Sequence, residues 1–470
     1  MSQATQPSGN NQRGVTPRPG HITKVPTEII VEIFKFAVFS SEEARSHGVK
    51  ALCLVSQYWN QIANGTPHLW TKVTLSYPLH ADQLSAAWKW LRASEEKALD
   101  IEIDLRDPAW VEFGKELYHP LRDSAKLLYA IALLRGSEHR WRSISFKLNV
   151  LGPIYKFLQA WEIPSLPLLE SISFEEDSGD LENGYTRFDP RESFELPTVF
   201  CSAGTLMPAL RGISLSAVNV NWVSAAASFQ NLRELRIRKL DYEACPTFNQ
   251  FAALLAASPR LETLDVTGYC PNPPTGTGVP LVYLPTLKNL VFGWTDVGPA
   301  LTFLETFQIP ESLETLSLID AVAGLFGYSD DSSLIFDLLA HLGQSDPGSG
   351  NHQAGKDRPR DRDHSTPWVS MLGLKSLSVS WVESSHDSIA RFLERAPAVE
   401  EICLADVGQG VLQGIASFVE TRRPSCLKKI NLQRSWSGGG ESFEAHHADI
   451  LRDHKIEVIE NPIEDRLRWK

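Results

Sequence analysis

Paired cysteines of the kind that hold a metal ion or a disulfide framework are missing from this 470-residue sequence. No two of its cysteines form a Cys-x-x-Cys pair, and the six are scattered at Cys53, Cys201, Cys245, Cys270, Cys403 and Cys426. Scattered single cysteines are typical of reduced thiols inside the cell. We therefore expect a protein of the cytoplasm, the nucleus or both.

An excess of positive charge is also missing. The chain has 45 Lys and Arg against 57 Asp and Glu, a formal net charge of −12, so no global field attracts nucleic acid or an acidic membrane surface. No stretch of about 18 apolar residues is present, so no membrane span is expected. Residues 1–20 contain Arg13 and Arg18 but no acid and no apolar core, which predicts a disordered tail and not a signal peptide.

Motifs of catalysis and cofactor binding are scarce as well. There is no Gly-x-Ser-x-Gly elbow, and the carboxylates are too dispersed to nominate an acid–base pair. The glycines of Gly408–Gly414 resemble a dinucleotide fingerprint, but the third comes one residue late, so a tight turn between strand and helix is favoured. His446, His447 and His454 lack the partners of a metal site. We predict no catalytic site, no cofactor and no metal.

What the chain does have is a strongly apolar helical segment near its start. Pro26 suits the first position of a helix, and Glu28 in the first turn is favoured by the helix dipole. The residues that follow at helical spacing and predict one apolar face are Ile29, Ile30, Ile33, Phe34 and Ala37. A second stripe contains Leu52, Val55 and Trp59, with Leu54 and Tyr58 beside it. Roughly fifty residues cannot bury this much apolar surface among themselves, so a neighbouring domain or a partner must cover part of it.

The order of these features resembles the F-box, a small three-helix module. It opens with an apolar-Pro pair, here Val25-Pro26 where Leu-Pro is usual, continues with the apolar first helix and a Leu-x-Val-Ser-x-x-Trp helix, and closes on Leu69-Trp70. The resemblance implies docking on a Skp-type adaptor, and through it on the cullin scaffold of an SCF ubiquitin ligase. The adaptor-binding positions that it implies are Val25, Pro26, Ile29, Ile33, Leu54, Val55 and Trp59. The alternative is a helical cap that seals the next domain.

After Trp70 a phrase of the form apolar-x-x-apolar-x-apolar recurs. Nine clear copies begin at Leu169, Leu210, Leu232, Leu261, Leu287, Leu313, Leu374, Val399 and Leu427. Weaker copies begin at Trp70, Ala98 and Trp141. Six of the eight steps between clear copies fall within the 20–29 residues of leucine-rich repeats. Each phrase reads as a short strand with inward apolar residues, followed by a helix-like stretch such as Phe248 to Pro259. The expected fold class is therefore α/β, a three-helix module followed by an irregular leucine-rich-repeat-like solenoid with parallel strands on the concave side and helices outside.

The predicted organisation has three parts: a disordered tail over 1–20, the F-box-like module over 21–70, and the solenoid over 71–470. The solenoid contains an insertion at 345–366 that has one apolar residue and therefore cannot form a core.

The sequence also nominates a target-binding patch on the concave face. Residues between the inward apolar positions, such as the two arginines, point to that face, and the tryptophans stand at the carboxyl-terminal edge of the strands. Aromatic and Arg side chains are the usual anchors of interfaces. The nominated residues are Arg236, Arg238, Trp294, Trp381 and Trp436. The alternative is that the tryptophans bury themselves beneath the loops of their own repeats. The resemblance to the F-box family thus implies a non-catalytic substrate receptor of an SCF-type ligase. The alternative is a scaffold or binding solenoid that plays no part in ubiquitin transfer.

Overall fold

The computed structural model describes residues 25–40, 42–106, 120–149, 165–176, 206–218, 220–240, 242–268, 271–272, 281–308, 310–321, 332–342, 371–422, 424, 426–434, 454 and 456–462. The predicted tail over 1–20 and the predicted insertion over 345–366 lie outside these residues. The chain divides into two compact units. The first runs to Lys72 and includes Lys89–Lys97, and the second comprises Val73–Trp88 and the chain from Ala98 onward.

The first unit is built on three α-helices and a short 3-10 turn: α1 (Thr27–Phe39), α2 (Glu42–Val55), α3 (Gln57–Asn64) and η2 (Pro67–Trp70). Pro26 stands at the N-cap of α1, one position before the helical place that the sequence suggested, and its carbonyl accepts bonds from the amides of Ile29 and Ile30. Ser56 caps α3 by accepting a hydrogen bond from the amide of Trp59 at 3.1 Å. This cap fixes where α3 begins.

Aromatic side chains hold the helices of this unit together. The rings of Phe34 in α1 and Trp59 in α3 lie 4.8 Å apart. The indole of Trp70 donates a hydrogen bond to the carbonyl of Ala63 at 2.8 Å and meets Trp90 edge-on at 5.3 Å. Tilted and edge-on ring pairs of this kind favour the packed state beyond the area they bury.

Within the described residues, the second unit is organised around a sheet of thirteen strands in the order β1-β2-β3-β4-β5-β6-β7-β9-β11-β12-β13-β14-β15. Every pair whose register is described is parallel. The first strands are β1 (Lys72–Ser76), β2 (Leu99–Asp104), β3 (Trp141–Leu148), β4 (Ser171–Glu176), β5 (Gly212–Ser216) and β6 (Glu234–Leu240). The later strands are β7 (Thr263–Gly268), β9 (Asn289–Trp294), β11 (Thr315–Asp320), β12 (Ser376–Ser380), β13 (Glu401–Ala405), β14 (Lys429–Arg434) and β15 (Glu457–Pro462).

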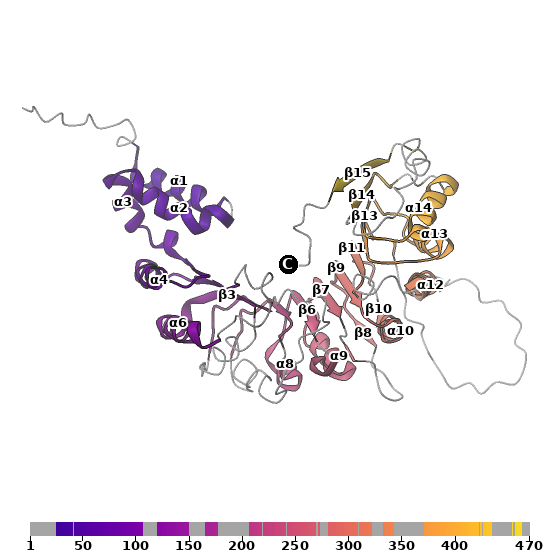
Figure 1. Ribbon diagram of the computed structural model, residues 1–470, viewed down its shortest axis with the longest axis horizontal. Helices are drawn as coiled ribbons and strands as arrows, with labels where there is room; N and C mark the ends of the chain where they lie inside the picture. The colour runs from indigo at the N-terminus through magenta and orange to yellow at the C-terminus, as the bar shows by residue number, and fades with distance from the viewer. Residues whose placement is uncertain are drawn as a thin grey trace, which may run out of the picture. The chain divides into compact units, whose positions relative to one another are not determined.

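Helices connect the strands and lie along one side of this sheet (Figure 1). They are α4 (Ala81–Ala93), α6 (Pro120–Leu134), α8 (Trp222–Ser228), α9 (Phe248–Ala256), α10 (Val297–Thr306), α12 (Ser333–Leu342), α13 (His386–Arg395) and α14 (Gln409–Arg422). The residues of α4 are divided between the two units. On the helix side, β8 (Val282–Tyr283) pairs with β10 (Phe307–Gln308). The predicted helix beginning at Phe248 is confirmed, and Thr247 starts it with a capping box to Gln250.

The apolar phrases of the sequence become aligned rows of the sheet. The second apolar residues of four consecutive phrases, Leu235, Leu264, Leu290 and Leu316, face one another in register across β6, β7, β9 and β11. All four side chains are buried. The prediction of parallel strands at the phrases is therefore confirmed. The apolar side chains of each of these strands are covered by those of the neighbouring strands.

A charged position follows the first apolar residue of every clear phrase, and its sign mostly alternates along the sheet. The series is Glu170, Arg211, Arg233, Glu262, Lys288, Glu314, Lys375, Glu400 and Lys428. Successive members form ion pairs at Lys288–Glu262 (3.0 Å), Lys375–Glu314 (3.2 Å) and Lys428–Glu400 (2.5 Å). Because these groups are exposed, each pair adds little stability. The alternation does place opposite charges next to each other on these neighbouring strands.

Candidate functional site: an apolar surface on the helical unit

The wide apolar face of helix α1 is divided between the core of the unit and solvent. Ile30, Phe34 and Val38 are buried inside the helical unit. Ile29 and Ile33 are each 52% exposed and Phe36 is 78% exposed. At 100° per residue the apolar arc of α1 is too wide for a single helix contact. One edge of the arc is therefore buried in the unit and the other edge is exposed to solvent. The sequence placed Ile29, Ile30, Ile33 and Phe34 on one apolar face that is wider than a two-helix contact needs, and the structure buries one edge of that face.

The end of α2 presents further apolar surface. Leu54 is 86% exposed and Val55 is 60% exposed, although both belong to a helix that packs on α1 and α3. Val25 is half-buried and Pro26 is exposed at the start of α1. Together Ile29, Ile33, Phe36, Leu54 and Val55 are termed the open surface.

Two aromatic residues of the helical unit differ from what the sequence predicted. Trp59 is half-buried because its ring packs on Phe34, so it is in part a core residue of the unit. Phe36 was missed by the sequence reading, although it stands seven residues after Ile29 and three after Ile33, a spacing that places all three on one side of a helix. That spacing is the signal that would have found it.

The surroundings of two titratable groups in the same unit shift their pKa values. Burial lowers the pKa of His68, and the charges of Lys97 and Lys35 lower it further, so its imidazole is neutral. Burial raises the pKa of the Cys53 thiol, which therefore stays protonated. Lys35 itself pairs with Glu32 at 2.7 Å. These shifts keep the His68 imidazole and the Cys53 thiol uncharged at neutral pH, so neither adds charge to the unit.

The arginines of the predicted target-binding patch are engaged within the sheet. The guanidinium of Arg238 donates to Asp265, with 2.9 Å between Nε and Oδ2, and Asp265 is almost fully buried. Burial alone would lower the pKa of Arg238, but the hydrogen bond and charge of Asp265 outweigh it and raise that pKa. Arg236 pairs with Glu234 on its own strand at 2.5 Å.

The tryptophans of that patch have separate environments. Trp294 is 2% exposed, which corresponds to the burial that the sequence left open as an alternative. Its indole Nε1 has no hydrogen-bond partner within the described residues. Trp381 is half-buried directly after β12, with a φ of 61°. Trp436 lies outside the described residues. The two arginines and Trp294 therefore do not form one exposed patch.

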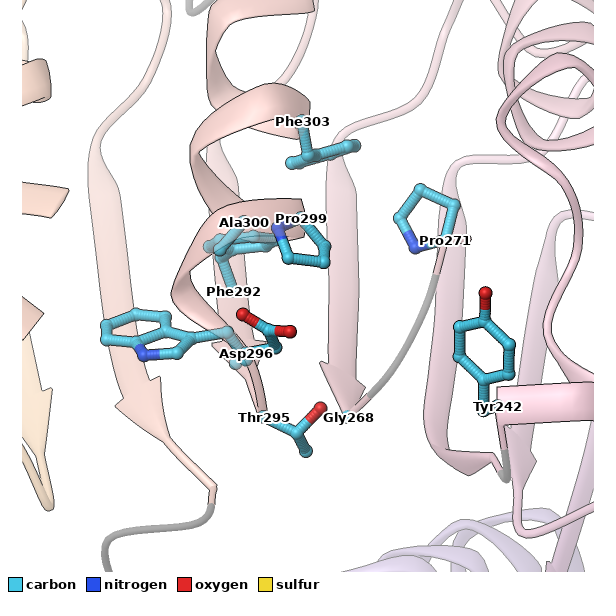
Figure 2. Close-up of a pocket in the computed structure, with 11 residues that line it drawn as sticks. Tyr242, Gly268, Pro271, Phe292, Thr295, Asp296, Pro299, Ala300 and Phe303 are labelled. Atoms are coloured by element: carbon cyan, nitrogen blue, oxygen red, sulfur yellow. The ribbon is translucent and has the colours of Figure 1, made fainter. Parts of the chain in front are cut away.

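Trp294 instead lines a small pocket, with a volume of about 90 Å³, at the carboxyl ends of β7 and β9. Figure 2 shows Asp296, Pro299 and Phe303 along one wall, with Pro271 and Tyr242 across from them and Gly268 and Thr295 at the base. The remaining lining residues are Phe292, Gly293 and Ala300. Asp296 caps α10 by accepting a hydrogen bond from the amide of Gly298 at 3.0 Å.

The space beside the glycines that resemble a dinucleotide fingerprint is occupied by other side chains of the protein. The carboxylate of Glu383 accepts a hydrogen bond from the amide of Gly410 at 3.2 Å, at the start of α14. A Cβ on Gly408 would stand 1.2 Å from the carboxylate of Glu383, and one on Gly414 would stand 2.0 Å from the side chain of Ile389. Since a carboxylate already occupies the place that a phosphate would take, the glycines are explained by close packing.

Of the predicted histidines, His446 and His447 fall outside the described residues, and His454 is half-buried in a turn. Among the residues that the structure describes, no three His, Cys, Asp or Glu side chains are grouped to hold a metal ion. In that same part of the chain, no helix has both the length and the apolar character needed to cross a bilayer.

Comparison with known families identifies the helical unit. Residues 22–76 match the F-box-like family. The match begins just before Val25-Pro26 and ends at the last residue of β1, so it contains the whole open surface. Domains of this family typically bind Skp-type adaptors, which supports an adaptor of that kind as a partner. No curated protein matches the chain.

Proposed function

We propose that this protein is the substrate-recognition subunit of an SCF-type ubiquitin ligase, with its F-box-like unit docked on a Skp-type adaptor through the open surface. The observation that carries the proposal is the exposure of Ile29, Ile33, Phe36, Leu54 and Val55 within the F-box-like match. Val25, Pro26 and the exposed part of Trp59 extend that contact in the proposal.

Energetics favour a partner for this surface. Full burial of a large apolar side chain contributes about 1.5–3 kcal/mol. Each of the five side chains is half or more exposed, so roughly 1 kcal/mol or more per residue is gained when a partner covers them. The unit has its own core in Ile30, Phe34 and Val38, so these outer residues are not required to hold α1 in place.

The second unit would hold the target. We propose that it is a leucine-rich-repeat-like solenoid, supported by phrase steps of mostly 22–29 residues and by the parallel, in-register sheet. The adaptor joins the receptor to a cullin, and the solenoid brings the target near a ubiquitin-charged conjugating enzyme. The receptor itself performs no chemistry in this proposal. It supplies proximity, which makes a bimolecular transfer effectively intramolecular, in the cytoplasm or nucleus.

Capture of a Skp-type adaptor by the full chain tests the docking step. Leu54→Glu and Ile33→Glu place a charge where apolar contact is proposed, and both should reduce the adaptor retained by more than tenfold while the melting temperature stays near that of the wild type. Val223→Glu is the matched control, because Val223 is 71% exposed and lies in α8, outside the F-box-like match. Equal retention by all four proteins would contradict the proposal.

Cullin recovery distinguishes ligase function from a scaffold role. A receptor in a ligase should co-purify with the adaptor and a cullin together, and Leu54→Glu should lose both. Adaptor without cullin would instead favour the scaffold alternative. If the helical unit is only a cap, the surface variants would lower stability without removing any partner.

A further inference from the structure

We propose that the pocket at the carboxyl ends of β7 and β9 takes a basic side chain, lysine or arginine, of the target protein. The proposal rests on the target-binding role above and names the chemistry of one residue that the target would present. It is carried by the pocket's lining, by the single charge at its wall and by the charge of the whole chain.

The pocket is assembled from three successive repeats. Tyr242 follows β6, Pro271 follows β7, and Thr295 and Asp296 join β9 to α10. It therefore opens where several parallel strands end, an arrangement that commonly positions ligands in α/β folds. No single repeat could form it.

Its lining suits an alkyl stem. Phe292, Phe303 and Ala300 line one side of the pocket with apolar atoms that are almost completely covered, and the half-buried ring of Pro299 lies beside them (Figure 2). Tyr242, half exposed, presents an aromatic ring on the opposite wall. Lysine and arginine bury their methylene stems on such surfaces and keep the charged head at a polar edge, and an aromatic ring attracts the head as well.

The sign of the charge selects a cation. Asp296 is the only acidic residue among the eleven that line the pocket, and none of them is Lys, Arg or His. Its Oδ1 accepts from Gly298 and its side chain is exposed, which leaves the carboxylate accessible at the pocket's edge. The amino end of α10 would by itself favour an anion, but Asp296 occupies that position and Pro299 has no amide hydrogen to donate. The net charge of −12 further favours a basic partner.

Small analogues test the pocket directly on the full chain. n-Butylammonium and n-propylguanidinium reproduce the lysine and arginine side chains, while 1-butanol and pentanoate remove or reverse the charge. Ligand-observed saturation-transfer NMR should show saturable binding of at least one of the two cations. Both 1-butanol and pentanoate should bind at least fivefold more weakly.

Asp296→Asn is the informative variant, because asparagine retains an N-cap and the fold should persist. It should weaken cation binding at least fivefold and leave 1-butanol unchanged. Tyr242→Ala should also weaken it, whereas Asp387→Asn, which alters an exposed carboxylate in the first turn of α13, should not. Unchanged binding to Asp296→Asn, or equal binding of 1-butanol and the cations, would overturn the proposal.

Two further arms separate the outcomes. The capped residue that matches the cation that binds, N-acetyl-lysine methylamide or N-acetyl-arginine methylamide, should bind as that cation does. If only the small cation binds, a target side chain is excluded. Asp296→Asn should still capture the adaptor at the wild-type level, so a failed pocket experiment with intact adaptor capture overturns the pocket proposal alone.

Discussion

The two units deal with apolar surface in opposite ways. In the sheet, each of these strands is flanked on both sides by strands with the same apolar pattern, so side chains such as Leu264, Leu290 and Leu316 are fully buried. In the helical unit, α1 buries Ile30 and Phe34 but leaves Ile33 and Phe36 in solvent. A repeated pattern provides its own partner, whereas a single small module with too much apolar surface does not. The difference locates the surface at which a second polypeptide is expected.

The largest predicted contrast comes from two phenylalanines two residues apart. Phe34→Ala should lower the free energy of unfolding by about 3–5 kcal/mol, because it opens a cavity against Trp59. Phe36→Ala should change it by less than about 0.5 kcal/mol, because its ring packs on little. Chemical denaturation of both variants measures the contrast. Comparable losses would mean that Phe36 belongs to the core.

A second comparison uses two helical glycines. A Cβ on Gly414 would meet the backbone carbonyl of His386 at 2.5 Å, so Gly414→Ala should force α13 and α14 apart and cost about 1–3 kcal/mol. At Gly298 the nearest atom is 3.5 Å from the added Cβ, so Gly298→Ala should be neutral or slightly stabilising. Thermal unfolding would show the ordering, and a tolerated Gly414→Ala would argue that the glycine stretch has another purpose.

The smallest effect is predicted for the alternating charges. The hydrogen bond and charge of Lys288 hold the pKa of Glu262 below its ordinary value. Because the pKa of Glu262 is lower in the folded protein than in the unfolded one, its ion pair stabilises the fold at pH values above the pKa of the unfolded state. That stabilisation is lost as the pH falls through the pKa of the folded state. Glu262→Gln should therefore lower the melting temperature slightly at neutral pH, less in high salt, and not at all in strong acid. Glu305→Gln, an exposed carboxylate of α10, is the control, and an equal shift there would remove any special role for the pair.

Periodicity made the sheet predictable. A strand phrase depends on near neighbours in sequence, and its partners are copies of itself, so all the clear phrases could be located before any geometry was known. On α1 the same reasoning gave only part of the answer, because spacing shows how wide an apolar arc is but not which edge the fold will bury. The choice between Ile29 and Ile30 depends on where α2 and α3 lie.

Sites built across repeats escaped prediction altogether. In the sequence Asp296 looks like an ordinary helix cap. No residue near it in the chain indicates that Tyr242 and Pro271 lie on the other side of the same pocket. Likewise, Gly410 and Glu383 are 27 residues apart, so their hydrogen bond has no local signature. Side chains such as Arg238 were nominated by type, and only the structure reveals that buried Asp265 already engages this one.

The most direct test of the open surface is calorimetric titration of a Skp-type adaptor into the purified full chain and its Ile33→Glu variant. The proposal predicts saturable binding to the wild type, with a negative heat-capacity change from apolar burial, and binding at least tenfold weaker to a variant that melts at the same temperature. Equal affinity for both proteins, or no binding to the wild type, would contradict it.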